Sequence, residues 1–102
     1  MNFLVYKISF PNSKFYIGVT TKPIEERILG HKKAARFKSS LVGRAIGKFG
    51  EHNIKTEVLF CCSSKEEMLR REKESIILFN SKHPFGYNLT DGGDGITGNK
   101  IS

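Results

Sequence analysis

Residues 3–20, FLVYKISFPNSKFYIGVT, decide the fold because they predict a β-hairpin. Residues 3–10 and 15–20 are rich in the β-branched and aromatic residues of strands, and the PNSK sequence between them is typical of a turn. If Tyr6 and Tyr16 share one face of the sheet, even-numbered residues must lie opposite even-numbered residues. The loop must then contain an odd number of residues, because side chains alternate between the two faces of a strand.

Two helices are predicted between this hairpin and residue 50. Pro23 suits the first position of a helix, and apolar or small residues recur at helical spacing to about Ala35. Ser39 or Ser40 can cap a second helix, and Gly50 is suited to end it.

A third strand and a long helix complete the predicted domain. Residues 54–61 (IKTEVLFC) read as the strand, and Ser64 with Glu67 forms a capping box that opens a helix to about Phe79. The order β-β-α-α-β-α predicts one α+β domain, in which helices flank a small three-stranded antiparallel sheet. The Gly-rich and polar residues from 86 onward predict a loop that leads into a tail or linker.

The charge balance favours a polyanionic partner. The chain has 102 residues, with 17 Lys and Arg against 10 Asp and Glu, and a formal net charge of +7. Nucleic acid or an acidic membrane surface would suit such a surplus. No stretch has the roughly 20 apolar residues of a membrane span, and residues 1–6 lack the pattern of a secretory signal. The adjacent Cys61 and Cys62 are interpreted as reduced thiols, so we expect a cytoplasmic protein.

One carboxylate falls on the apolar face of the last predicted helix. Leu69, Ile76 and Phe79 form a stripe at helical spacing, and Glu72 lies between them. From these residues alone, the more common interpretation is a glutamate at the edge of the stripe that extends to solvent or pairs with a lysine. The alternative is a carboxylate held beside a cleft, where it would bind a hard cation such as Mg²⁺.

Two further pairs of residues also have both a structural and a functional interpretation. Arg27 and His31 are spaced i,i+4, so they project from one side of a helix and could bind phosphate, although such a pair is more often a solvated face. Tyr6 and Tyr16 are candidate site residues, although strand tyrosines usually pack in the core. Gly18 lies two residues after Tyr16, and its lack of a side chain would let a substrate backbone approach closely.

The order of these residues along the chain resembles the GIY-YIG nuclease family. Leu4-Val5-Tyr6 and Phe15-Tyr16-Ile17-Gly18 are similar to the two tripeptides that name the family, and the first of them is a variant that keeps the tyrosine. The resemblance covers nearly the whole chain, and it favours the functional interpretation of the polar residues above. The later residues that match are Glu26, Arg27, His31, Arg44, Ala45, Ile46, Phe49, Gly50, Glu72, Gly86, Tyr87 and Asn88.

The C-terminal sequence narrows the resemblance to homing endonucleases encoded by phages and introns. It reads GYNLT at 86–90, GGDG at 92–95 and GNK at 98–100. This likeness implies a catalytic domain over residues 1–90, with 91–102 as a Gly-rich tail or the start of a linker to a DNA-binding segment. It also implies a phage or virus as the source, while DNA-repair members of the superfamily are the less favoured branch.

The resemblance implies a metal-dependent endonuclease that cuts DNA to leave 5′-phosphate and 3′-hydroxyl ends. Glu72 would be the only protein ligand to one Mg²⁺ or Mn²⁺ ion, whose other ligands would be waters and the scissile phosphate. Tyr6 would be the leading candidate to activate the attacking water, with Tyr16 and His31 positioning that water and relaying its proton. Arg27 would stabilise the charge that builds on the phosphoryl oxygens.

Other residues would hold the loop or the DNA. Asn88 would either tie the C-terminal loop to the site or contact the phosphate. Homing members often have a further histidine after the first helix, and here Lys38 stands near that place. His52 and His83 are expected to be surface or loop residues. A groove that tracks the DNA backbone would be lined by Lys32, Lys33, Arg36, Lys38, Arg44 and Lys48.

Two alternatives and one open question remain at this point. A non-catalytic nucleic-acid-binding domain could keep the same scaffold and basic residues, and a DNA-repair nuclease could share the fold. One metal site serves one DNA strand at a time, so the oligomeric state stays open between a monomer and a transient dimer.

Overall fold

The computed structural model describes residues 2–37 and 40–92, and the side chains of residues 34–37 are not described. The predicted order β-β-α-α-β-α is confirmed, and a short 3₁₀ helix that was not predicted precedes the third strand. The elements are β1 (Phe3–Ser9), β2 (Phe15–Thr20), α1 (Ile24–Phe37), α2 (Leu41–Phe49), η1 (Glu51–Asn53), β3 (Lys55–Cys62) and α3 (Lys65–Phe79). The predicted tail, 91–102, lies outside the described residues from position 93 onward.

The sheet has three antiparallel strands in the order β2-β1-β3. The central strand β1 is hydrogen-bonded on both edges, and its residues Val5, Tyr6 and Ile8 are fully buried. A β-bulge in the β1–β3 pairing shifts the register between Val5 and Tyr6. Strands β2 and β3 are therefore the two edges of the sheet, on opposite sides of β1.

The hairpin has the register that places both tyrosines on one face. Tyr6 lies opposite Gly18, and Ile8 lies opposite Tyr16. The last pair is Ser9 with Phe15, so residues 10–14 form the loop, and the prediction of an odd number is confirmed.

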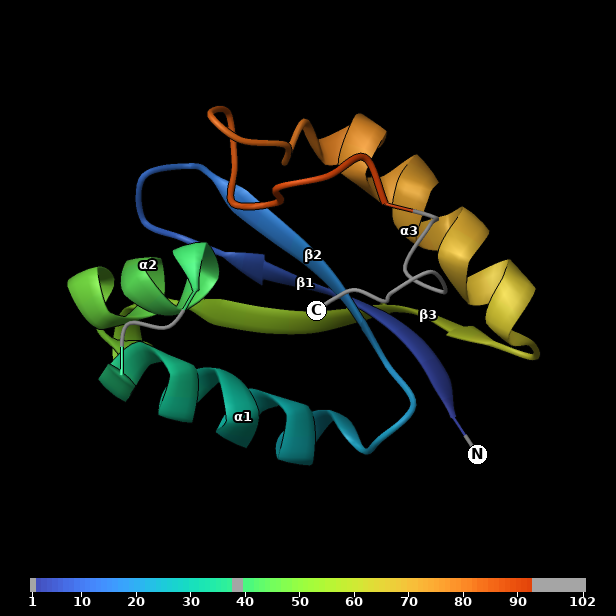
Figure 1. The fold of residues 1–102 in the computed structure, drawn as a ribbon, viewed down its shortest axis with the longest axis horizontal. Helices are drawn as coiled ribbons and strands as arrows, with labels where there is room; N and C mark the ends of the chain where they lie inside the picture. The colour runs from blue at the N-terminus through green and yellow to red at the C-terminus, as the bar shows by residue number, and fades with distance from the viewer. Residues whose placement is uncertain (1, 38–39, 93–102) are drawn as a thin grey trace.

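Helices cover both faces of the sheet, as Figure 1 shows. Helices α1 and α2 lie on one face, where α2 packs on the even-numbered side chains of β1. Helix α3 lies on the other face, where it packs on odd-numbered residues such as Val5 and Ile17. The helix that carries Glu72 is thus separated by the sheet from the helix that carries Arg27 and His31. Side chains from the two layers can meet only around an edge strand.

The N-cap of α2 agrees with the sequence-based prediction, whereas that of α3 differs from it in one hydrogen bond. Ser40 caps α2, and its hydroxyl oxygen accepts the Gly43 N–H at 3.0 Å. Ser64 caps α3 by accepting the Glu67 N–H at 3.1 Å. The reciprocal bond of a capping box was predicted wrongly, because the Glu67 carboxylate accepts the N–H of Ser63 at 2.9 Å and its hydroxyl at 3.1 Å. Ser63 offers two donors to one oxygen, so the carboxylate reaches past the cap residue.

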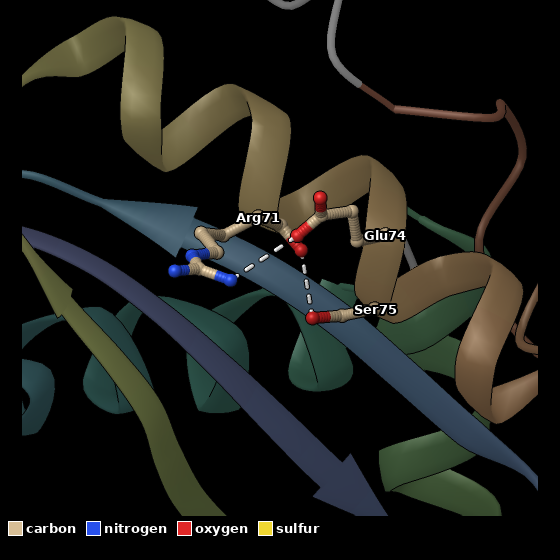
Figure 2. Close-up of polar contacts among 3 residues, drawn as sticks. All are labelled: Arg71, Glu74 and Ser75. Carbon is tan, nitrogen blue, oxygen red and sulfur yellow. Dashed lines mark hydrogen bonds and ion pairs between the residues drawn. The ribbon is translucent and has the colours of Figure 1, made fainter.

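Polar side chains of α3 make contacts within the helix, and one of them also reaches the sheet. Ser75 is buried, and its hydroxyl donates to the Arg71 carbonyl oxygen at 2.7 Å, which satisfies the buried group (Figure 2). The Arg71 guanidinium pairs with Glu74 at 3.4 Å and also lies 4.8 Å from the centre of the Phe60 ring on β3. Of these contacts, the one between Arg71 and Phe60 joins α3, the helix that carries Glu72, to strand β3.

Candidate active site

Helix α1 brings two polar side chains to the hydroxyl of Tyr6. The Tyr6 oxygen lies 2.6 Å from Nε2 of His31, and it accepts a hydrogen bond from Nε of Arg27 at 3.1 Å. Arg27 and His31 therefore share one side of the helix, as their spacing predicted. Since Arg27 already donates to the phenol oxygen, we assign the Tyr6 proton to the bond with His31.

The aromatic ring of Tyr16, the second tyrosine, completes this cluster. The Tyr16 ring lies 6.3 Å from the Tyr6 ring and 5.5 Å from the His31 ring, measured between centroids. The Tyr6 and His31 side chains are buried, whereas that of Tyr16 is half-buried. The Tyr16 residue is thus less enclosed than Tyr6, although burial is also the first cause that raises the pKa of its phenol.

Burial sets the protonation of these groups. Burial, together with the nearby charge of Arg27, lowers the pKa of His31 to about 4, so its imidazole is neutral at pH 7. Burial and then the neighbouring Tyr16 phenol raise the pKa of Tyr6, while the Arg27 charge acts in the opposite direction. The pKa of Tyr16 is also raised, first by burial, again against the effect of Arg27. Arg27 is thus the fixed positive charge that would favour a phenolate on either tyrosine.

Glu72 acts on this cluster from the other layer of the fold. Its side chain is half-buried, and its negative charge contributes to the raised pKa of Tyr16. Because Tyr16 is on β2, at the edge of the sheet, the two layers meet there in the way that the topology requires.

A metal ion would have to bind here through few protein atoms. Within residues 2–37 and 40–92, no group of three or more His, Cys, Asp or Glu side chains could hold an ion. A single carboxylate fits Mg²⁺, which keeps several waters and is commonly bound by one or two carboxylates together with substrate phosphates. The donor set around Glu72 is therefore compatible with the predicted ion.

The structure gives Gly18 a role that the sequence did not predict. A Cβ atom at this position would overlap the ring and hydroxyl of Tyr6, which lies directly opposite across the hairpin. The close approach of a substrate backbone stays a prediction, but on the side where a Cβ would lie the space beside Gly18 is filled by the Tyr6 ring. Gly18 thus makes room for the side chain that contacts His31 and Arg27.

Asn88 is buried and ties the C-terminal loop to β2. Its Oδ1 atom accepts the Ile17 N–H at 2.8 Å, and its Nδ2 atom donates to the Ile17 carbonyl at 2.7 Å. This is the first of the two predicted roles. A phosphate contact is disfavoured, because the side chain is only 7% exposed and its oxygen also accepts the Ser81 hydroxyl at 2.7 Å.

Two residues that support this loop received no role from the sequence. Ser81 is fully buried beneath Asn88, and Tyr87 binds the hairpin loop through its ring, 4.7 Å from that of Phe10. The Tyr87 hydroxyl also accepts a hydrogen bond from Asn12 at 2.9 Å. Gly86 is a sequence feature that could have pointed to this packing. A Cβ atom at Gly86 would overlap the backbone of Ser81, so the loop packs closely there.

The predicted basic residues do not all gather at this site. Lys33, Arg44 and Lys48 are exposed. Lys32 pairs with Glu51 at 3.8 Å, and it lines a groove of about 460 Å³ together with residues of β3, the edge opposite to Tyr16. The Arg36 side chain and the whole of Lys38 lie outside the described residues.

The remaining predicted residues lie outside the cluster. His52 and His83 are exposed, in agreement with the prediction. Cys61 is exposed, Cys62 is half-buried, and both are free thiols. In the part of the chain that the structure describes, no helix is both long and apolar enough to cross a membrane.

Comparisons with known proteins agree with this geometry. The family described as the GIY-YIG catalytic domain matches residues 2–88. The segB protein of Enterobacteria phage T4, which carries a provisional endonuclease designation, is 35% identical over 97 residues. That match covers 93% of this chain and 41% of the T4 protein. The catalytic domain of the intron endonuclease I-TevI, solved as a mutant, superposes with a TM-score of 0.74 at 28% identity, covering 89% of this chain and 96% of that one. The chain therefore belongs to the GIY-YIG family of catalytic domains.

Proposed function

We propose that this domain is a divalent-metal-dependent endonuclease of the homing type, which hydrolyses DNA phosphodiester bonds. The products would carry 5′-phosphate and 3′-hydroxyl ends. The observation that supports this best is the convergence of His31 and Arg27 on Tyr6, with Tyr16 and the charge of Glu72 beside them. The likeness to a phage protein and to an intron endonuclease, both designated as endonucleases, supports the same substrate class.

Tyr16 is the phenol best placed to meet the attacking water. Its pKa is influenced by the charge of Glu72 and its residue is half-buried, whereas Tyr6 is buried and its hydroxyl has two hydrogen-bond partners on α1. We therefore assign Tyr6 the role of orienting His31 and Arg27, and Tyr16 the role of positioning the water. Neutral His31 can accept the hydrogen bond of the Tyr6 hydroxyl, and Arg27 can stabilise the negative charge that builds on the phosphate.

Glu72 is the residue that would hold one Mg²⁺ or Mn²⁺ ion. A bound divalent ion would supply positive charge that lowers the pKa of a coordinated water and stabilises the phosphate oxygens. Burial raises the pKa of both phenols, so they stay protonated at neutral pH and offer little phenolate to accept a proton from water. A nearby positive charge would favour the phenolate.

Exposed cations would supply the affinity for DNA. Lys33, Arg44 and Lys48 are exposed on α1 and α2, and the chain carries a net charge of +7. Contacts of this kind bind the DNA backbone without reading its sequence, and they weaken as salt rises. Action on DNA would take place inside a cell. One site can cut one strand at a time, so cutting both strands would need sequential nicks or a transient dimer.

Incubation of supercoiled plasmid with and without Mg²⁺ tests the proposal. The parent should convert the plasmid to nicked or linear forms only with the metal, and Glu72→Gln should abolish conversion while DNA binding persists. Glu74→Gln is the matched control, since Glu74 lies on the same helix, is exposed and contacts Arg71 on the surface. Parental cleavage by Glu72→Gln would remove Glu72 from the reaction.

Two other results would favour the alternatives. Salt-dependent DNA binding by the parent, without nicking under any divalent metal, would indicate a non-catalytic nucleic-acid-binding domain. Cleavage restricted to branched or damaged DNA would indicate a repair nuclease on the same fold.

A further inference from the structure

The space beside the Gly92 backbone is bordered by the side chains of Glu72 and Ile76. A Cβ atom at Gly92 would lie 3.3 Å from both Cγ and Cδ of Glu72, and 2.7 Å from Cδ1 of Ile76. Gly92 also has a φ of +80°, a region that residues with side chains rarely adopt. The backbone conformation therefore favours glycine, and a larger residue would have to displace the side chains of Glu72 and Ile76.

The loop that carries Gly92 reaches α3 by a fixed route. After α3 the chain turns back along β2, and its last described residues return to α3 (Figure 1). Asn88 holds the loop to Ile17 of β2 by two hydrogen bonds. Asp91 pairs with Lys82 at 3.0 Å, and the Gly92 N–H donates to the Thr90 hydroxyl at 3.3 Å. Gly92 is thus placed by contacts on the residues immediately before it.

We infer that Gly92 is a positioning residue for Glu72, because its lack of a Cβ atom leaves free the space that the Glu72 side chain needs in its observed position. This inference rests on the proposed role of Glu72 as the metal ligand. A glutamate side chain has several rotamers, and a Cβ atom at position 92 would crowd the one that Glu72 adopts, because it would lie 3.3 Å from both Cγ and Cδ. Under the proposed function, a shift of this side chain would move the carboxylate that holds the metal ion.

The variant Gly92→Ala tests the inference, with Gly50→Ala as its matched control. Gly50 has a similar φ of +87°, but a Cβ there would meet only Nδ2 of Asn53, at an ordinary 3.5 Å. The control therefore introduces the same kind of backbone strain away from Glu72. Far-UV circular dichroism and urea unfolding would establish that both variants are folded.

Mn²⁺ titration without DNA gives the first readout. Paramagnetic broadening of the Glu72 amide signal in NMR spectra reports binding at this residue. Gly92→Ala should weaken the apparent Mn²⁺ affinity about tenfold or more, as changes to residues that orient a metal ligand typically do. Gly50→Ala should leave that affinity unchanged. In plasmid cleavage, Gly92→Ala should raise the Mg²⁺ concentration needed for half-maximal rate more than it lowers the rate at saturating Mg²⁺.

Each result separates this inference from the proposed function. Parental Mn²⁺ affinity in Gly92→Ala would overturn the inference while leaving the ligand role of Glu72 in place. Absence of broadening at Glu72 in the parent would overturn both.

Two further measurements keep the inference testable if Gly92→Ala does not fold correctly. Ile76→Val removes the Cδ1 atom, so recovery of Mn²⁺ affinity in the double variant would show that packing on Ile76, and not Glu72, matters. In the parent, a nuclear Overhauser contact is expected between the Cα protons of Gly92 and the Cγ protons of Glu72. Its absence would overturn the inference without any variant.

Discussion

The ring of Tyr6 occupies the space above Gly18 that a Cβ atom would need, and the two residues lie directly opposite each other across the β1–β2 hairpin. From this position the Tyr6 hydroxyl reaches His31 and Arg27 on α1. Gly18, in the second of the two family tripeptides, thus makes room for Tyr6, the tyrosine of the first. This relationship links the register of the hairpin to the geometry of the site.

Gly18→Ala should destabilise the domain. The added methyl group would force the Tyr6 ring away from β2, and overpacking of this kind costs about 1–3 kcal/mol. Urea unfolding measures the change. Gly30→Ala is a control with the opposite expected sign, because Gly30 lies inside α1 and a Cβ there would meet only Nη1 of Arg27, at 3.6 Å. Alanine should stabilise that helix by about 0.5–1 kcal/mol. Equal stability of parent and Gly18→Ala would contradict the proposed contact.

The low pKa of His31 should make stability fall as the pH decreases. An unfolded histidine takes up a proton near pH 6.5, whereas the folded one does so only near pH 4. Between these values the unfolded state binds more protons, so the contribution of neutral His31 is complete above about pH 6.5 and is lost towards pH 4. The loss should reach about 3 kcal/mol.

Unfolding free energies of parent and His31→Gln, measured between pH 4 and 7.5, would isolate this effect. The variant should lack the component of the pH dependence assigned to His31. His52→Gln, a change at an exposed histidine, should keep it. A parental pH dependence in His31→Gln would refute the assignment of the titration to His31.

The element order and the spacing of Arg27 and His31 were predictable because they depend on local periodicity. Helical spacing brings both residues to one side of α1, and strand alternation fixes the parity of the hairpin loop. Helical periodicity also places Glu72 on the inner face of its helix. It does not indicate which face of the sheet that helix covers, and the electrostatic influence of Glu72 on Tyr16 depends on that tertiary arrangement.

Contacts between distant segments could not be predicted from the sequence. Gly18 looked open to a substrate, because nothing local to the second strand indicates that the Tyr6 ring lies above it. Ser81 and Gly92 have no periodic pattern, and their roles come from packing against Asn88 and Glu72. Burial is a further tertiary quantity, and the raised pKa values of Tyr6 and Tyr16 that it causes have no counterpart in the local sequence pattern.

Removing the two phenol hydroxyls should separate stability from activity. Tyr6→Phe leaves buried His31 and the Arg27 Nε–H without their shared partner, which should cost about 1–3 kcal/mol as well as activity. Tyr16→Phe should cost little stability, and under the proposed function it should slow plasmid nicking about 10²- to 10⁴-fold. Single-turnover nicking rates and urea unfolding measure the two effects. Full activity of Tyr16→Phe would exclude its proposed role at the attacking water.

Asn88 should act through the stability of the β2 edge. Asn88→Ala removes the partners of the Ile17 N–H and C=O, and buried groups left unpaired cost about 1–3 kcal/mol each. Asn88→Asp keeps an acceptor for the N–H but places a second oxygen against the Ile17 carbonyl, so the change of one atom should also destabilise. Ser81→Ala removes only the hydroxyl that donates to Asn88 and should have a smaller effect.

Amide hydrogen exchange at Ile17 distinguishes this role from contact with the phosphate. If Asn88 holds the loop to β2, both Asn88 variants should exchange the Ile17 amide faster and unfold at lower urea concentration, in parallel with any loss of cleavage. Asn53→Ala is the control, because that side chain donates to the Phe49 carbonyl on an exposed part of the surface. Unchanged exchange at Ile17 together with lost cleavage would instead assign Asn88 to the substrate, since only a direct contact could then explain the loss.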